Sequence, residues 1–218
     1  MAKSEKFEEA QLIQRKIDSI ILVTSQKHKP FEYEVNPNLR QDLRSQETHE
    51  LQKVLNENGM DIKKLERIEC YDISNITGKH AVGSMVVFTN GEKDSGNYRR
   101  FQIKRPPKVV PNDFAMMREV ITRRLNHKEW GTPDLIIVDG GKGQISSAMK
   151  AILEGNADFP LMGIAKREEL LITSDFKVIR LSKGSPALNL VRRIRDEAHR
   201  FAITYHRKVR SKAFIEEK

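Results

Sequence analysis

One stretch, at residues 134–144, constrains the fold more than any other: it reads Asp-Leu-Ile-Ile-Val-Asp-Gly-Gly-Lys-Gly-Gln. The apolar run at 135–138 is too short for an independent helix and is rich in β-branched residues, which predicts a strand buried on both faces. The run ends at Asp139. The glycines after it predict a tight turn with unusual backbone dihedrals, followed by a helix over 145–153. Because ligands bind at the carboxyl ends of strands in open α/β sheets, Asp139 is a candidate site residue.

A second predicted strand, over 67–74, also ends near a lone carboxylate, Asp72. If the two strands are parallel neighbours, Asp72 and Asp139 face one crevice. Adjacent carboxylates repel each other, and both stay ionised at low cost only with a cation between them. Oxygen ligands of this kind suit Mg²⁺ or Mn²⁺, and such sites commonly perform phosphodiester chemistry. The sequence therefore predicts a divalent metal site.

The order of the predicted elements indicates the fold class. Turn sequences separate three strands, which predicts an antiparallel meander with Gly83 as a candidate β-bulge. The elements in order are strands over 67–74, 80–88 and 97–104, a helix over 112–125 with Phe114 on its apolar face, the strand at 135–138 with its helix, a strand over 161–165, a small hairpin and a long helix from Ser185-Pro186. This is the order of the ribonuclease H-like fold, an α/β class in which a mixed sheet, the meander plus parallel strands, is flanked by helices.

Charge is unevenly distributed along the chain. The net charge of +9 divides into −1 over residues 1–66 and +10 over residues 67–218. Residues 192–212 alone hold eight basic and two acidic residues. A stripe of this kind could be a solvated helix face, but the excess of positive charge favours contact with a nucleic-acid phosphate backbone. The predicted DNA contacts from this stripe are Arg192, Arg193, Arg200 and Arg207.

Cysteine content and hydropathy indicate the compartment. Cys70 is the only cysteine, so neither an intrachain disulfide nor a cysteine zinc site can form, which favours a reducing environment. The longest apolar run near the start, at 20–23, is far too short to span a membrane, and no signal-peptide pattern precedes it. We expect a cytoplasmic protein without membrane contact.

The first residues form a separate amphipathic pattern. Apolar residues lie three or four apart between Ser4 and Ile21, at Phe7, Ala10, Ile13, Ile17 and Ile20. The pattern predicts a helix that either packs on its own domain or docks on a partner, and periodicity alone favours neither. The expected organisation is a helical appendage over 1–24, a linker over 25–66 with a short helix at 45–57, and a compact domain over 67–214.

Four motifs carry a resemblance to a known family. They are Cys70-Tyr-Asp-Ile-Ser-Asn, Asp139-Gly-Gly-Lys-Gly-Gln, Gly163-Ile-Ala-Lys-Arg and Arg195-Asp-Glu-Ala-His-Arg-Phe-Ala-Ile. In this order they resemble the C-terminal endonuclease half of UvrC, the incision subunit of bacterial nucleotide excision repair. The family's catalytic trio of two aspartates and one histidine maps onto Asp72, Asp139 and His199, and a further family aspartate maps onto Asp113.

The resemblance implies an activity and partners. It implies a metal-dependent DNA endonuclease, with Mg²⁺ or Mn²⁺, that makes the 5′ incision beside a lesion in damaged double-stranded DNA. It also implies that UvrA and UvrB find the lesion. Residues 5–20 look like the UVR motif, so the resemblance implies docking on UvrB through Phe7, Ala10, Ile13 and Ile17. The family's 3′-incision domain and helix-hairpin-helix module have no counterpart in this sequence, so only the 5′ incision is expected of it.

The remaining site residues are expected around the metal. His199 would help to hold a metal ion, or would move a proton to or from the attacking water or the leaving oxygen. Asp196, one turn before it, would orient the imidazole or pair with Arg192 or Arg193. Lys142 at a helix start, with Lys166 and Arg167 at another strand's end, is expected on the phosphate path.

Two other classes of function make different predictions. The glycine-rich sequence at 140–143 lacks the Walker spacing and the Ser or Thr after the lysine, so nucleotide binding is not expected. A non-catalytic adaptor that binds UvrB and DNA is the alternative to a nuclease. An adaptor predicts that Asp72→Ala leaves every activity intact, whereas a nuclease predicts loss of cutting with binding retained.

Overall fold

The structure is a computed structural model that describes residues 38–76, 80–103, 113–165 and 170–216. The chain divides into two compact units, Met1–Asp42 and Leu43–Lys218, and the sheet belongs to the second. The predicted appendage helix, with Phe7, Ala10, Ile13 and Ile17, lies outside the described residues.

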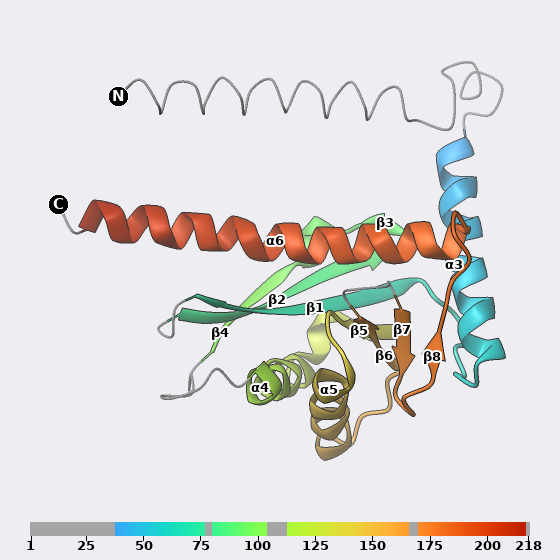
Figure 1. The fold of residues 1–218 in the computed structure, drawn as a ribbon, viewed down its shortest axis with the longest axis horizontal. Coiled ribbons are helices and arrows are strands. Elements are labelled where there is room, and N and C mark those ends of the chain that lie inside the picture. The colour runs from blue at the N-terminus through green and yellow to red at the C-terminus, as the bar shows by residue number, and fades with distance from the viewer. Residues whose placement is uncertain (1–37, 77–79, 104–112, 166–169, 217–218) are drawn as a thin grey trace. The chain divides into compact units, whose positions relative to one another are not determined.

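The described residues contain eight strands and four α-helices (Figure 1). The strands are β1 (Arg67–Ile76), β2 (His80–Thr89), β3 (Glu92–Lys93), β4 (Arg99–Gln102), β5 (Leu135–Val138), β6 (Leu161–Ala165), β7 (Leu170–Thr173) and β8 (Val178–Ile179). The helices are α3 (Leu39–Glu57), α4 (Asp113–Leu125), α5 (Lys142–Glu154) and α6 (Pro186–Glu216), with short 3-10 helices η1 (Ser95–Asn97) and η2 (Lys128–Trp130). No helix in the described ranges is long and apolar enough to cross a membrane.

All eight strands form one mixed sheet. Its order is β3-β2-β1-β5-β6-β7-β8, and β4 also pairs with β2. The pairs β1–β5 and β5–β6 are parallel, whereas the pairs that involve β2, β7 and β8 are antiparallel. The predicted combination of an antiparallel meander with parallel strands is therefore confirmed.

Helices cover both faces of the sheet: α6 lies along one face, and α4 and α5 lie on the other (Figure 1). The alternation of side chains along β1 explains these two layers. Ile68 and Cys70 join the core cluster that α6 covers, whereas Tyr71 joins the cluster that α4 and α5 cover. The residues of β5 are all buried, as a central parallel strand requires.

Helix α3 packs on the same side as α6, because Leu51 and Leu55 are fully buried in the α6 cluster. The helix begins at Leu39, earlier than the predicted start at residue 45. The prediction followed apolar periodicity, whereas the first buried position of the helix is the charged residue Glu47. This helix falls in the segment expected to be a linker, and the domain boundary near residue 67 stays a prediction.

A buried ion pair connects β1 to α4. Glu69 is 0% exposed, and Arg124 donates to both of its carboxylate oxygens at 2.9 Å. The Tyr71 hydroxyl and Arg67 Nε also donate to this carboxylate, at 2.6 and 3.0 Å. Burial, together with the charge of Glu69, raises the pKa of the Tyr71 hydroxyl well above its usual range. The network therefore connects β1 to α4 through a charged pair, Glu69 and Arg124, and a neutral tyrosine.

Gly83 was predicted to mark a β-bulge, and this prediction is wrong. The register between β1 and β2 is continuous through Ile73↔Gly83 and Asp72↔Ser84. A Cβ atom at residue 83 would lie 2.4 Å from Cγ2 of Val120 on α4. Glycine is required there because the helix approaches the strand closely, not because the strand is irregular.

Phe114 was predicted on the inward face of α4, but its side chain is 53% exposed. The buried residues of this helix are Met116, Met117, Val120, Ile121 and Arg124. Arg124 is one of these inward positions because it pairs with Glu69 on β1. The Phe114 ring instead lies over Gly143, where an added Cβ would come within 2.3 Å of a ring carbon.

Candidate metal centre

The parallel pairing of β1 with β5 brings two carboxylates together. The register ends at Tyr71↔Val138, and the Asp139 amide donates to the Tyr71 carbonyl at 2.8 Å. Asp72 and Asp139 are therefore the next residue on each strand. Asp72 was expected at the end of its strand, but β1 continues to Ile76 because it remains paired with β2. It is the shorter β5 that ends here.

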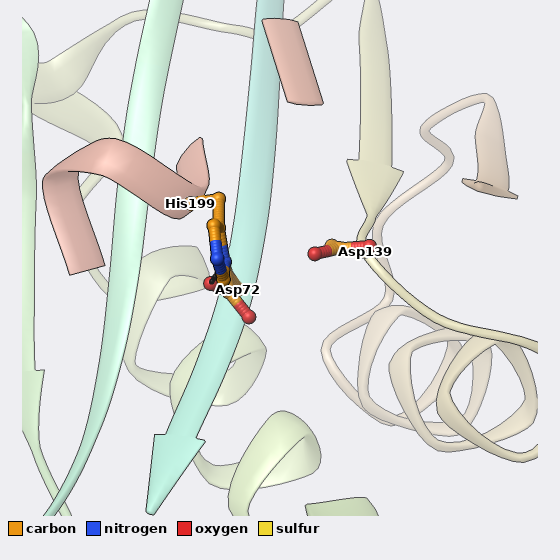
Figure 2. A group of neighbouring side chains, drawn as sticks. All are labelled: Asp72, Asp139 and His199. Atoms are coloured by element: carbon orange, nitrogen blue, oxygen red, sulfur yellow. Dashed lines mark ion pairs between the residues drawn. The ribbon is translucent and has the colours of Figure 1, made fainter. Parts of the chain in front are cut away.

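His199, on α6, is the third member of the group formed with Asp72 and Asp139. Helix α6 crosses the sheet over β1 and β2, and His199 points from it toward Asp72 (Figure 2). His199 Nδ1 lies 3.9 Å from Asp72 Oδ2. One ligand atom from each of Asp72, Asp139 and His199 lies within 4.8 Å of the others. The three predicted catalytic residues thus converge on one point, although β1, β5 and α6 are far apart in sequence.

Burial differs among the three side chains. Asp72 and Asp139 are only 4% and 3% exposed, whereas the His199 side chain is 60% exposed. Two buried carboxylates this close repel each other, and a divalent cation with a preference for oxygen removes the repulsion. An imidazole nitrogen at the exposed side completes a mixed O/N donor set. These residues therefore fit a divalent metal ion.

Cys70 lies on the same strand as Asp72 but does not belong to the cluster of ligand atoms. It is fully buried, and burial followed by the charges of Asp139 and Asp72 raises the pKa of its thiol well above the usual range. Among the described residues, the clustered ligand atoms come from Asp72, Asp139 and His199. The site is therefore built from oxygen and nitrogen donors.

Close packing requires glycine at one position of the turn after Asp139 and at a position of β6 beside it. Gly140, Gly141 and Gly143 do not have positive φ angles, which corrects the unusual dihedrals predicted for this turn. A Cβ at Gly140 would lie 1.6 Å from Oε1 of Gln144, and one at Gly163 would lie 2.5 Å from the Gly140 carbonyl oxygen. Gly141 differs, because a Cβ there meets nothing within 4 Å. The backbone of β6 thus supports the turn that carries Asp139.

A second buried network holds α6 above the site. Glu197 is 3% exposed and accepts hydrogen bonds from Lys93 Nζ at 2.7 Å, Tyr98 Oη at 3.2 Å and Arg200 Nε at 2.9 Å. Burial opposes ionisation of Glu197, but the hydrogen bonds from Arg200 and Lys93 dominate and lower its pKa to about 2. Since Glu197 is two residues before His199, this network fixes the segment of α6 that carries the histidine.

Comparison with known proteins identifies the family. Residues 57–203 match the sequence model of the UvrC RNase H endonuclease domain. The chain belongs to this family. The resemblance noted from four motifs is thereby confirmed, and the mixed sheet is the ribonuclease H-like sheet of these endonuclease domains.

Several curated relatives are named UvrABC system protein C. The protein from Dictyoglomus thermophilum is 44% identical over 170 residues, which cover 77% of this chain and 28% of that protein. The protein from Chlorobaculum tepidum is 42% identical over 192 residues, with coverages of 85% and 30%. The protein from Methanosphaera stadtmanae is 48% identical over 160 residues, with coverages of 67% and 26%. The chain thus spans less than a third of each of these relatives.

Solved structures are more distant. Endonuclease V of Ciona intestinalis, in complex with an inosine-containing DNA, has a TM-score of 0.37 and 12% identity, and the similarity covers 55% of this chain and 56% of that chain.

Several residues predicted for the UvrC domain's site lie outside the cluster of three ligands. Asp113 is the first residue of α4 and is not among the clustered side chains. Lys142 is the first residue of α5, with Nζ 5.7 Å from the centre of the Phe176 ring. Lys166 and Arg167 lie outside the described residues, as does the side chain of Arg207.

Arg193 contributes to the fold. It was predicted to contact DNA, but its guanidinium forms an ion pair with Glu47 on α3 and donates to the Gly91 carbonyl at 2.9 Å. Burial lowers the pKa of Arg193, and the charge of Glu47 opposes this shift. The contact of Arg193 with DNA stays a prediction.

Arg195 was assigned no role by sequence, although it lines the same hollow as the ligands. The hollow, of about 320 Å³, is bordered by Asp139, Arg195, Asp196 and His199. Asp196 was expected to orient His199 or to pair with Arg192 or Arg193, but it accepts hydrogen bonds from Arg195 at 2.9 and 3.2 Å. The sequence contained a signal for this placement: Arg195 and His199 are four residues apart and therefore lie on one helix face.

Proposed function

We propose that this chain is a divalent-metal-dependent DNA endonuclease that makes the 5′ incision beside a lesion in UvrABC nucleotide excision repair. The observation that carries the proposal is the convergence of Asp72, Asp139 and His199 within 4.8 Å. Membership of the UvrC RNase H endonuclease domain family supports it. The reaction is hydrolysis of one phosphodiester bond.

Asp72 and Asp139 would hold Mg²⁺ or Mn²⁺ between them. When bound, the cation neutralises charge on the phosphate and makes water more acidic. The exposed imidazole of His199 faces the hollow, where it would complete the ligand set or carry a proton to the leaving oxygen. Asp113 would support the site from the start of α4 without a direct ligand role.

The DNA backbone would follow the basic residues around this edge of the sheet. Lys142 and Arg192 are exposed, and the Arg200 side chain is 59% exposed although it pairs with Glu197. We include Lys166, Arg167 and Arg207 in the same surface on the basis of their sequence positions. Cationic side chains position a phosphate backbone without reading its sequence, which suits a nuclease directed to lesions by other proteins.

The proposed partners are damaged double-stranded DNA, UvrB and, indirectly, UvrA. UvrB would bind the UVR-like helix through Phe7, Ala10, Ile13 and Ile17. UvrA and UvrB would locate the lesion, as the resemblance to UvrC implies.

The test is incision of a lesion-bearing duplex that already carries a 3′ nick, with this chain, UvrA, UvrB and MgCl₂. The existing nick removes the need for a second nuclease. Asp139→Ala is compared with Asp61→Ala, an exposed aspartate outside the cluster. We expect a 5′ cut from the wild type and Asp61→Ala, and none from Asp139→Ala.

An adaptor without catalytic activity predicts a different result. Wild type and Asp139→Ala would then bind UvrB and DNA equally, and neither would cut the nicked duplex. That outcome would replace the nuclease proposal with the adaptor. Cutting by both chains at equal rates would place the active site elsewhere.

A further inference from the structure

The hollow that contains the candidate ligands also contains a cation from the protein itself. Arg195 lines it together with Asp139 and His199. Arg195 lies one helical turn before His199, on the same face of α6. Its side chain is only 24% exposed, so it lies against the wall of the hollow instead of extending into solvent.

The orientation of Arg195 is supported by its neighbour. Asp196 Oδ1 accepts hydrogen bonds from Nη2 at 2.9 Å and from Nε at 3.2 Å. The Asp196 side chain is 68% exposed, so solvent screens this ion pair. The contact therefore limits the rotation of the guanidinium beside the hollow.

A guanidinium has the chemistry that a reacting phosphodiester needs. It is always protonated, and its planar donors match two oxygens of one phosphate group. During hydrolysis, a water oxygen bonds to phosphorus, the bond from phosphorus to the leaving oxygen breaks, and negative charge on the phosphate oxygens increases. Donors fixed in place beforehand stabilise that charge without reorganisation.

We propose that Arg195 is a further catalytic residue that binds the non-bridging oxygens of the scissile phosphate and stabilises their charge in the transition state. This role rests on the proposed nuclease function. The water loses one proton and the leaving oxygen gains one, while Arg195 stays protonated throughout. Its contribution is electrostatic and adds to that of the metal ion.

A purely structural role for Arg195 predicts different metal binding. If Arg195 acts on the phosphate, its removal takes a positive charge away from Asp72 and Asp139, so a divalent cation binds as tightly as before or more tightly. If Arg195 only maintains the shape of the site, its removal weakens metal binding together with cutting. The dissociation constant of Mn²⁺ therefore separates the two roles.

The experiment uses the full chain with Arg195→Ala, Arg195→Lys and the control Arg118→Ala. Arg118 is an exposed arginine on α4 that pairs with Glu154, away from the hollow. Mn²⁺ binding is measured by calorimetry, and incision is measured on the pre-nicked duplex with UvrA and UvrB. We expect Arg195→Ala to cut roughly 10²–10³-fold more slowly, with Mn²⁺ affinity equal or higher. Arg195→Lys should retain intermediate activity, because lysine keeps the positive charge but cannot donate to two phosphate oxygens from one planar group. Arg118→Ala should match the wild type.

Two results would overturn the inference while the nuclease function stands. One is cutting by Arg195→Ala within about threefold of the wild type. The other is a parallel loss of Mn²⁺ affinity and cutting. Failure of the wild type to cut would instead overturn the proposed function itself, and the role of Arg195 with it.

Discussion

The Asp139 amide donates a hydrogen bond of 2.8 Å to the carbonyl oxygen of Tyr71. This contact continues the parallel register of β1 and β5 by one residue. Asp72 and Asp139 consequently lie side by side, buried, at the place where β5 stops. The site follows from the difference in length between two neighbouring strands.

The first prediction concerns metal binding by this pair. Asp139→Asn should raise the melting temperature without metal, because one of two repelling charges is removed. The wild type should gain about 2.7 kcal/mol of stability when Mn²⁺ is present at about 100 times its dissociation constant, and Asp139→Asn should gain little. Thermal unfolding with and without MnCl₂ measures both effects. Asp61→Asn is the control, and equal stabilisation of Asp139→Asn and the wild type by Mn²⁺ would refute the site.

The second prediction separates two glycines near Asp139. Gly163→Ala should destabilise the fold and weaken Mn²⁺ binding, because its Cβ would lie 2.5 Å from the Gly140 carbonyl oxygen and backbone cannot move aside easily. Gly141→Ala should leave the melting temperature nearly unchanged, because its Cβ meets nothing within 4 Å. Denaturation and Mn²⁺ titration of both variants check this. Equal melting temperatures for the two variants would contradict the packing argument.

The third prediction concerns the buried pair Glu69–Arg124. Arg124→Ala should cost about 3–5 kcal/mol of folding free energy, because it leaves a buried carboxylate without its main partner. Arg118→Ala removes an exposed ion pair and should cost at most about 1 kcal/mol. Urea denaturation measures both costs. A loss below about 1 kcal/mol for Arg124→Ala would mean that the pair does not hold α4 on β1.

The fourth prediction concerns stability in acid. The pKa of Glu197 is lowered in the folded protein from 4.5 to about 2, so its stabilising effect is complete above pH 4.5 and is lost as the pH falls toward 2. The effect is on the order of 3 kcal/mol. Glu197→Gln should be less stable than the wild type at neutral pH, and its stability should depend less on pH between 4.5 and 2. Unfolding free energies across this range test it, and identical pH slopes for the two proteins would rule it out.

Local pattern was sufficient for much of the fold. The apolar run of β5, the alternation of β1 and the proline at the start of α6 each predicted its element, because burial of a strand or a helix face imposes a short-range period on the sequence. The candidate ligands Asp72 and Asp139 stood out for the same reason, since each is a carboxylate that interrupts an apolar strand.

The partners of charged residues were not evident from the sequence. Arg193 and Arg195 belong to one basic stripe in the sequence, yet one is paired with Glu47 in the fold and the other lines the hollow beside His199. Phe114 was assigned to the core because its spacing fits the apolar face, but it is exposed, and Arg124 takes an inward position of α4, where it pairs with Glu69. These outcomes depend on contacts between segments far apart in the chain, which a local period does not contain.

The chain's residues, taken in order, are enough to define the strands, the helices, the family and the three ligand candidates, because periodicity and motif are local properties. Three-dimensional packing alone established that Asp72 adjoins Asp139, that α6 sets His199 above them, and that Arg195 shares their hollow. The physical reason is that the register of the sheet and the placement of α6 arise from the simultaneous burial of both faces of the sheet. That burial couples residues more than a hundred positions apart, such as Lys93 and Glu197.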